Sequence, residues 1–220
     1  KPAGKLSGKS PSFPLNPDKA NWSVWDFPDV VDHWNFPGYE GKKMTVSVYS
    51  NCEQVELFLN GESLGKQENT ADKKNTLVWE VPYAHGILKA VSYNKGGEVG
   101  TATLESAGKV EKIRLSADRT EIVADGNDLS YITLELVDSK GIRNQLAEEL
   151  VEFSIEGDAT IEGVGNANPM SIESFVANSR KTWRGSNLLV VRSGKSSGRI
   201  IVTAKVKALP VASITITQKK

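Results

Sequence analysis

The sequence predicts an all-β protein made of two tandem immunoglobulin-like β-sandwich domains, preceded by an irregular segment rich in proline and tryptophan. Short runs that alternate apolar and polar residues recur with turn signals about every 8 to 12 residues, as is typical of antiparallel sandwiches. No long segment has helical periodicity. The length of 220 residues suits two domains of about 100 residues better than one.

The first domain is expected at residues 41–106. Met44, Val46 and Val48 share one face of a run with period two, which indicates a half-buried strand. The pair Asn60-Gly61 readily adopts positive φ and predicts a tight hairpin. The expected strands of this domain are residues 44–48, 55–59, 63–65, 77–81, 87–93 and 99–104.

A small, polar stretch at residues 106–109 separates this domain from a second one, expected at residues 109–218. The expected strands are residues 113–115, 122–124, 132–136, 151–155, 159–162, 172–177, 188–192, 200–204 and 214–216. Residues 145–150 are the only weak candidate for a helix.

Residues 1–40 hold six of the nine prolines and three of the five tryptophans. Because proline fixes φ and donates no N–H, we expect this segment to be mostly irregular or extended and to stay out of a central sheet. Its aromatic content argues against a free linker, so we expect it to pack on the first domain or on a missing domain. The candidates for contact with a carbohydrate or another domain are Trp22, Trp25, Trp34 and Tyr39.

Composition excludes several functions. The 27 basic and 27 acidic residues give no net charge, so nucleic acid is not an expected partner. No apolar run approaches the roughly 20 residues that span a bilayer, so membrane insertion is not expected. Cys52 is the only cysteine, which excludes an internal disulfide, and we expect it to be a partly buried thiol.

Two groups of motifs carry a resemblance. In the second domain these are residues 124–141, the glycine- and asparagine-rich stretch 163–169, and the series Glu173, Phe175 and Arg180 before Arg192-Ser193. In the first domain they are His33-Trp34, Pro37-Gly38 and residues 55–61, 79–83 and 86–91. Over roughly residues 26–217, the two domains in this order resemble the C-terminal, non-catalytic domains of bacterial glycoside hydrolase family 2 enzymes of the β-galactosidase type.

The resemblance implies an accessory C-terminal region that supports a catalytic barrel, subunit packing or the substrate entrance. Retaining glycosidases need two carboxylates about 5 Å apart, which this family holds on a TIM barrel. The chain is too short for such a barrel beside two sandwiches, so we expect no catalysis from it. The implied partners are a missing catalytic domain, β-galactoside-containing glycans and, in the parent protein, further subunits. A periplasmic or secreted bacterial parent follows from the resemblance alone.

Other chemistry finds no support in the sequence, and we expect no catalytic, cofactor-binding or metal-binding residue. Asp29, Asp32 and His33 fit a polar turn better than a metal site. Residues 125–128 lack the closing glutamate of a calcium loop and fit a β-turn. His33 and His85 are the only histidines, and neither belongs to a nucleophilic triad motif.

The glycines, asparagines and Pro169 of residues 163–169 fit a loop that leaves a strand. The arginines near this loop are expected to form a structural network rather than a sugar site. The pairing expected is of Arg180, Arg184 and Arg192 with Glu162 and Glu173 across one sheet edge.

Two alternatives to the accessory role remain open from the sequence. One is a carbohydrate-binding module whose exposed Trp or Tyr rings stack on sugars, since aromatic faces suit pyranose C–H surfaces. The other is a pair of bacterial cell-surface adhesion or spacer domains. The two domains are not obvious copies of each other, which counts against a simple repeat array.

Overall fold

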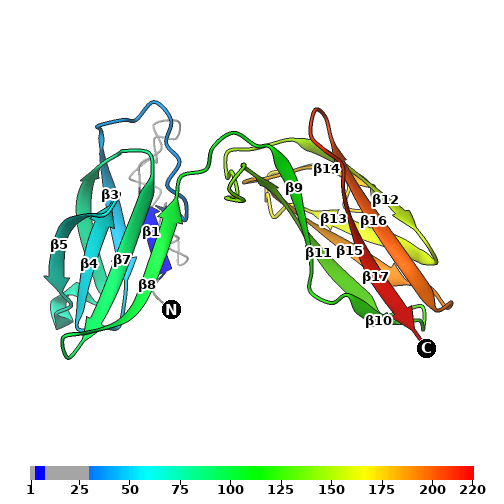
Figure 1. The fold of residues 1–220 in the computed structure, drawn as a ribbon, viewed down its shortest axis with the longest axis horizontal. Helices are drawn as coiled ribbons and strands as arrows, with labels where there is room; N and C mark the ends of the chain where they lie inside the picture. Colours follow the sequence, from blue (N-terminus) through cyan, green and yellow to red (C-terminus); the bar gives the residue numbers. More distant parts are fainter. Residues whose placement is uncertain (1–2, 8–29) are drawn as a thin grey trace. The chain divides into compact units, whose positions relative to one another are not determined.

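The computed structural model describes residues 3–7 and 30–220, whose contacts divide the chain into two compact units, Lys1–Ser106 and Ala107–Lys220 (Figure 1). Each unit is a sandwich of two β-sheets around its own apolar core. The predicted all-β fold class is therefore confirmed.

In the first unit, sheets of order β2-β1-β3-β6 and β5-β4-β7-β8 enclose the core. Their strands are β1 Ala3–Ser7, β2 Val30–Val31, β3 Lys43–Tyr49, β4 Gln54–Leu59, β5 Glu62–Glu68, β6 Thr76–Pro82, β7 Ile87–Asn94 and β8 Gly97–Glu105, with a short 3-10 helix at Ala71–Lys73. Every second residue of β3 faces inward, so that Val46 and Val48 pack with Leu57 and Leu77 in one core. Asn60 and Gly61 have φ values of 53° and 88° and join β4 to β5, as the hairpin prediction requires.

One expectation for the N-terminal segment is wrong. Strand β1 lies between β2 and β3 in the sheet, with Leu6 opposite Val46, although residues 1–40 were expected to stay out of a central sheet. The reason lies in the spacing of the prolines, because residues 3–7 contain none and can pair on both sides. Residues 32–42 are irregular, as expected. Residues 8–29 lie outside the described part of the chain.

In the second unit, sheets of order β10-β17-β16-β12-β14 and β13-β15-β11-β9 face each other. Their strands are β9 Lys112–Ala117, β10 Glu121–Val123, β11 Leu129–Val137, β12 Leu150–Glu156, β13 Ala159–Gly165, β14 Ser179–Lys181, β15 Ser186–Ser193, β16 Gly198–Val206 and β17 Ala212–Lys219. Alternation along β11 buries Ile132, Leu134 and Leu136 completely, against residues such as Phe153 of β12. Strand β10 pairs in parallel with β17, whereas the other pairs are antiparallel.

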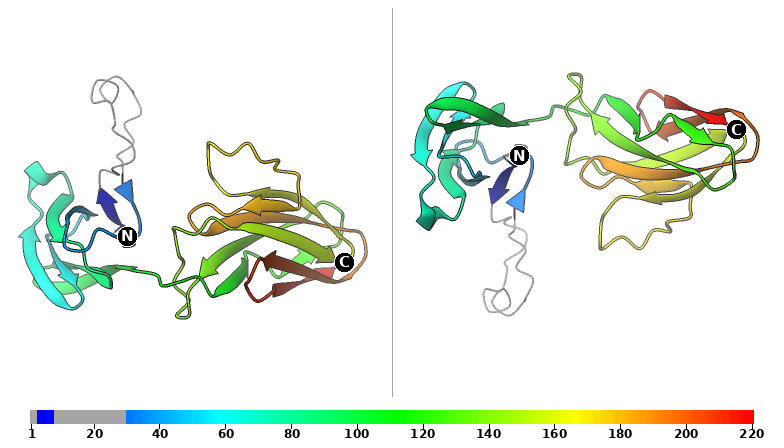
Figure 2. Two further views of the ribbon diagram at one scale, coloured as in Figure 1. Left: turned by 90° about the horizontal axis from the view of Figure 1, so that it is seen from above. Right: turned by 90° about the horizontal axis from the view of Figure 1, so that it is seen from below.

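Two local predictions in this unit are wrong. Residues 172–177 were expected to form a strand, but they lie in the loop between β13 and β14, which projects away from the strands in both views of Figure 2 (gold). Apolar and β-branched residues there are not buried, so no sheet neighbour rewards an extended conformation. Residues 145–150, the weak helical candidate, form a turn that leads into β12. Within the described residues, no helix is long and apolar enough to cross a membrane.

Candidate functional site

Of the four aromatic candidates, Trp34 lies in the core of the first unit. Its side chain has no exposed surface, and its indole Nε1 donates a hydrogen bond to the carbonyl of Ala84 at 2.9 Å. Its ring meets those of Tyr83 and Phe36 edge to face, with centroids 5.1 Å and 6.0 Å away. Trp34 therefore cannot present a ring face to a sugar, and it packs on its own domain.

The other three candidates contribute no exposed platform in the described chain. Tyr39 is half-buried against the same core, with the Lys42 ammonium 4.4 Å from the ring centroid. Its ring is thus covered in part by a cation from three residues away. Trp22 and Trp25 lie outside the described residues.

The most unusual surface of the second unit is the loop of residues 166–178, which we call the β13–β14 loop. Its apolar side chains are the most exposed of the large hydrophobic residues in the described chain: Met170 is 84% exposed, Ile172 101%, Val176 80% and Phe175 61%. Other exposed apolar residues, such as Val211 at 57%, are exposed to a smaller extent. Clusters of this kind on soluble proteins mark contact sites for another surface.

Polar contacts hold both ends of the β13–β14 loop. The Asn166 carboxamide donates to the carbonyl of Lys181 at 2.9 Å and accepts from the N–H of Asn168 at 3.0 Å. The Glu173 carboxylate accepts the N–H of Lys181 at 3.0 Å. Val164, at the end of β13, donates its N–H to the carbonyl of Phe175 at 2.8 Å. The loop therefore has a defined shape although its large apolar side chains are exposed.

Arg180 binds the β13–β14 loop from the interior of the second unit. The side chain is completely buried, and Nη1 donates to the carbonyls of Val164 and Glu173 at 3.2 and 3.1 Å. Its guanidinium carbon lies 4.2 Å from the centroid of the Phe175 ring. Since Nε and Nη2 have no hydrogen-bond partner in the described chain, this ring contact supplies part of the stabilisation of the buried charge.

The expected arginine–glutamate network exists only in part. Arg192 pairs with Glu162 on the exposed face. Arg180 instead binds backbone carbonyls, while Arg184 lies over the Trp183 ring at 4.7 Å. The N–H of Lys181 lowers the pKa of Glu173, an effect that burial opposes and Ser171 and Arg180 reinforce. This carboxyl group is therefore a structural anion.

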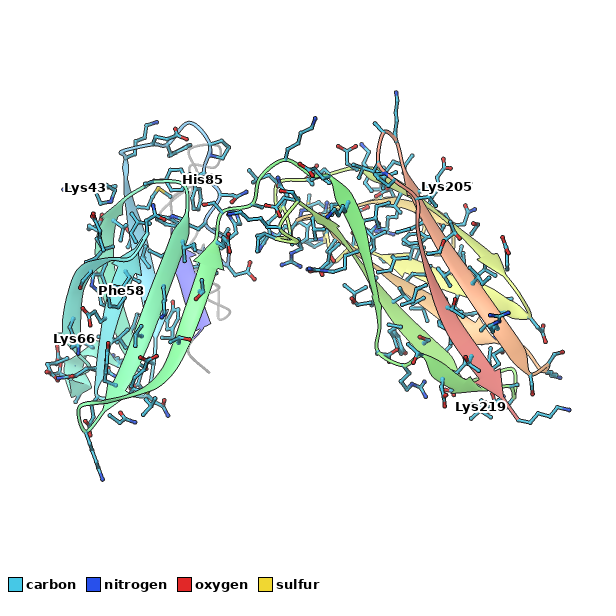
Figure 3. All side chains as sticks on the ribbon, in the orientation of Figure 1. Lys43, Phe58, Lys66, His85, Lys205 and Lys219 are labelled. Atoms are coloured by element: carbon cyan, nitrogen blue, oxygen red, sulfur yellow. The ribbon has the colours of Figure 1, made fainter. Side chains whose placement is uncertain are left out.

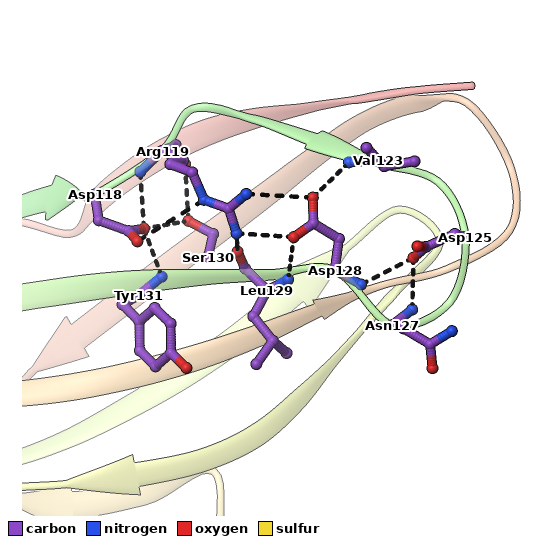
Figure 4. A network of polar contacts seen from close by, with 9 residues as sticks. All are labelled: Asp118, Arg119, Val123, Asp125, Asn127, Asp128, Leu129, Ser130 and Tyr131. Atoms are coloured by element: carbon purple, nitrogen blue, oxygen red, sulfur yellow. Dashed lines mark hydrogen bonds and ion pairs between the residues drawn. The ribbon is translucent and has the colours of Figure 1, made fainter.

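Residues 125–128 form a bend closed by side-chain to backbone hydrogen bonds, within a larger polar network (Figure 4). The Asp125 carboxylate accepts the N–H groups of Asn127 and Asp128 at 2.8 and 2.9 Å. Arg119 donates to Asp128 at 2.8 Å, and Asp128 also accepts the N–H of Val123 at 2.8 Å. The contact with Arg119 lowers the pKa of Asp128. In residues 3–7 and 30–220, no group of three or more His, Cys, Asp or Glu side chains is arranged to hold a metal ion.

A second polar cluster lies on sheet β5-β4-β7-β8, where Figure 3 labels Lys66 and Phe58. The Lys66 ammonium lies 3.6 Å from the Tyr93 ring centroid and 3.8 Å from the Glu56 carboxylate. Ser63 donates to Glu56 at 2.6 Å, and this hydrogen bond is the main cause of the lowered pKa of Glu56. These groups satisfy one another, so the cluster stabilises the sheet.

The remaining residues of chemical interest have structural partners. His33 accepts the N–H of Asn35 through Nδ1 at 3.1 Å, and the backbone carbonyl of His85 accepts a hydrogen bond from Asn60 at 3.2 Å. Cys52 is half-buried, as expected. An open hollow at one end of the second unit lies between residues 109–111, 144–149 and 206–209. Its lining in the described chain contains no aromatic ring, so it does not fit stacking on a sugar.

The fold defines the chain as tandem immunoglobulin-like β-sandwich modules. Residues 113–215 match the family described as glycoside hydrolase family 2 C-terminal domain 5, and residues 41–100 match a domain of unknown function, DUF4982. The chain therefore belongs to glycoside hydrolase family 2, as C-terminal domains of that family. The resemblance of the motifs to C-terminal domains of glycoside hydrolase family 2 is confirmed.

Relatives and solved structures agree with this assignment. A beta-galactosidase of Bacteroides ovatus, BoGH2A, is 32% identical over 92% of this chain and 24% of its own length. A beta-glucuronidase of Formosa agariphila is 30% identical over 90% of this chain and 20% of its own length. A glycosyl hydrolase family 2 member from Bacteroides cellulosilyticus with a known crystal structure is 95% identical in sequence, with a TM-score of 0.95. The match covers 100% of this chain and 28% of that protein chain. The chain thus spans about a quarter of the length of these proteins.

The sequence did not single out the exposed side chains of the β13–β14 loop as functional. The available signal was Pro169 among asparagines, a composition typical of a loop, which follows the end of β13 at Gly165. Met170 follows this proline directly, and residues 172–177 were predicted to be a strand because apolar character normally means burial.

Proposed function

We propose that this chain is a non-catalytic C-terminal region of a β-galactosidase-type glycoside hydrolase and that it stabilises the catalytic part of the same polypeptide. The observation that carries the proposal is the joint match of both units, in order, to about a quarter of the length of glycosidases.

The electrostatics support a non-catalytic role. A general acid for glycoside hydrolysis needs a raised pKa, because the carboxyl group must remain protonated near neutral pH. In the described chain, every carboxyl group with a displaced pKa is displaced downward. These groups are Glu56, Asp72, Asp125, Asp128, Asp138, Asp158 and Glu173. Their hydrogen bonds favour the ionised form, which suits loops and turns.

The same proposal includes the substrate, since we expect the full-length polypeptide to prefer a galactoside over a glucuronide. Beta-galactosidases and beta-glucuronidases both occur among the relatives, and the motif resemblance favours the former. Turnover of para-nitrophenyl β-galactoside and β-glucuronide by the full-length polypeptide tests this choice. Faster turnover of the glucuronide would reverse it without affecting the accessory role.

The accessory role is tested by assaying this chain alone, the full-length polypeptide, and the full-length polypeptide without this chain. We expect no turnover by the chain alone, and a lower melting temperature and activity after its removal. Appreciable turnover by the chain alone contradicts the non-catalytic role. Unchanged stability and activity after removal contradict the supporting role.

A further inference from the structure

We propose that the β13–β14 loop is a preformed docking surface for the catalytic part of the same polypeptide. This inference rests on the proposed function and names the surface through which the support acts. The occupant is the portion of the polypeptide outside this chain, and the contact is apolar.

The first argument is the mismatch between order and exposure in the loop. Met170, Ile172 and Val176 project from a loop whose ends are bound by Asn166, Glu173 and Arg180, as described above. A loop that is flexible loses entropy when it docks, whereas one already held in shape loses little. The polar contacts therefore keep apolar side chains ready for a contact that the second unit itself does not supply.

The second argument comes from the buried charge. Among the described residues no carboxylate lies within ion-pair distance of the buried Arg180 guanidinium. Burial of such a charge is costly, and such a group normally has a specific structural task. Here its two carbonyl contacts fix the path of the loop, and Phe175 covers it. Phe175 itself is 61% exposed, so it also belongs to the exposed apolar residues of the loop.

The third argument concerns the size of the contact and selects the occupant. A stable complex between separate proteins buries at least about 1,000 Å². A single loop with four large apolar side chains supplies only part of this area. A partner on the same polypeptide needs less, because covalent connection gives a high effective concentration. About three quarters of the length of the matched proteins lies outside this chain, so a tethered partner is available.

The two methionines of the chain provide a direct test. Met170 is 84% exposed, and Met44 is 7% exposed in the core of the first unit. Hydrogen peroxide converts accessible methionine to the sulfoxide, which peptide mass spectrometry resolves residue by residue. In the isolated chain we expect rapid oxidation of Met170 and slow oxidation of Met44.

In the full-length polypeptide we expect oxidation of Met170 to be about tenfold slower than in the isolated chain, because a docked side chain reacts only while the contact is open. Equal rates in both proteins overturn the proposal. Protection that depends on protein concentration and is lost in the monomer also overturns it, because a second copy would then be the occupant.

A charge inserted into the surface gives an independent measurement. Ile172→Asp should lower the melting temperature of the full-length polypeptide but not of the isolated chain, since Ile172 is fully exposed there. Val211→Asp, at another exposed apolar residue of the same unit, is the matched control and should leave both unchanged. Equal effects of the two variants in the full-length polypeptide contradict docking through this loop.

The proposed function can survive failure of this inference. If removal of the chain destabilises the enzyme while Met170 stays reactive, the support acts through another surface. If removal has no effect, the proposed function itself fails, whatever the reactivity of Met170.

Discussion

The buried guanidinium of Arg180 lies 4.2 Å from the ring centroid of Phe175, a residue that is itself mostly exposed. The pair joins the interior of the second unit to the exposed apolar side chains of the β13–β14 loop. Because Arg180 also donates to the carbonyls of Val164 and Glu173, the loop, the end of β13 and the core depend on one side chain.

Replacement of this arginine should loosen the loop and destabilise the second unit. Arg180→Ala removes two carbonyl contacts and leaves a cavity, which together cost on the order of 3 kcal/mol in the free energy of unfolding. Urea denaturation measures this loss, and hydrogen exchange of residues 166–178 should become faster. Arg199→Ala, at an exposed arginine of β16, is the control. Similar stability of the two variants would contradict the anchoring role.

Trp34 should matter for folding of the first unit rather than for sugar binding. Its ring is fully buried and hydrogen-bonded to Ala84, so Trp34→Ala should cost about 3–5 kcal/mol in the free energy of unfolding. Tyr39→Ala, at a half-buried aromatic residue of the same region, should cost clearly less. Denaturation followed by the circular dichroism of the backbone, rather than by tryptophan fluorescence, compares the two variants. A small effect of Trp34→Ala would show that the ring is not a core element.

Acid should weaken the network around Asp128. The pKa of Asp128 is lowered in the folded state. Its contribution to the free energy of unfolding is therefore present above the ordinary aspartate pKa of about 3.9, and it is lost as the pH falls through the folded pKa. Asp128→Asn should therefore be less stable than the unchanged chain at neutral pH, and the difference should shrink in acid. Urea denaturation at both pH values measures it.

The control for this pH dependence is Glu148→Gln, a change at an exposed carboxylate outside the network of Asp128. Its effect on stability should be small at both pH values. If the Asp128→Asn difference stays constant between neutral and acid pH, the charge of Asp128 does not stabilise the turn.

Gly185 should tolerate no side chain. Its φ is +69°, and an added Cβ would lie 2.2 Å from the carbonyl oxygen of Asn144. Gly185→Ala should therefore cost about 3 kcal/mol, from left-handed strain and the backbone clash. Gly198→Ala meets no atom within 4 Å and should be neutral or slightly stabilising. Thermal denaturation of both variants tests the contrast, and equal melting temperatures would refute it.

Most strands were predictable because burial of one face makes apolar and polar residues alternate along the sequence. Met44, Val46 and Val48, and likewise Ile132, Leu134 and Leu136, lie inward as their alternation predicts. The hairpin at Asn60 was predictable for a local reason too, since positive φ at two successive residues favours that pair.

The β13–β14 loop was not predictable in this way. Ile172, Phe175 and Val176 have strand-like composition, and composition by itself carries no information about whether a neighbouring strand exists to pair with them. Strand β1 was missed because the prolines before and after it argued against any strand in this segment. The short stretch between them nevertheless pairs with β3.

The sequence by itself determined the all-β class, the alternation that places each core residue, the tight turns and the membership of glycoside hydrolase family 2. Only the tertiary structure decided which aromatic and charged residues lie inside. It buried Trp34 and Arg180, and it left Met170 and Ile172 exposed. The physical reason is that period and turn chemistry are local properties of the chain, whereas burial depends on which distant strands pack together.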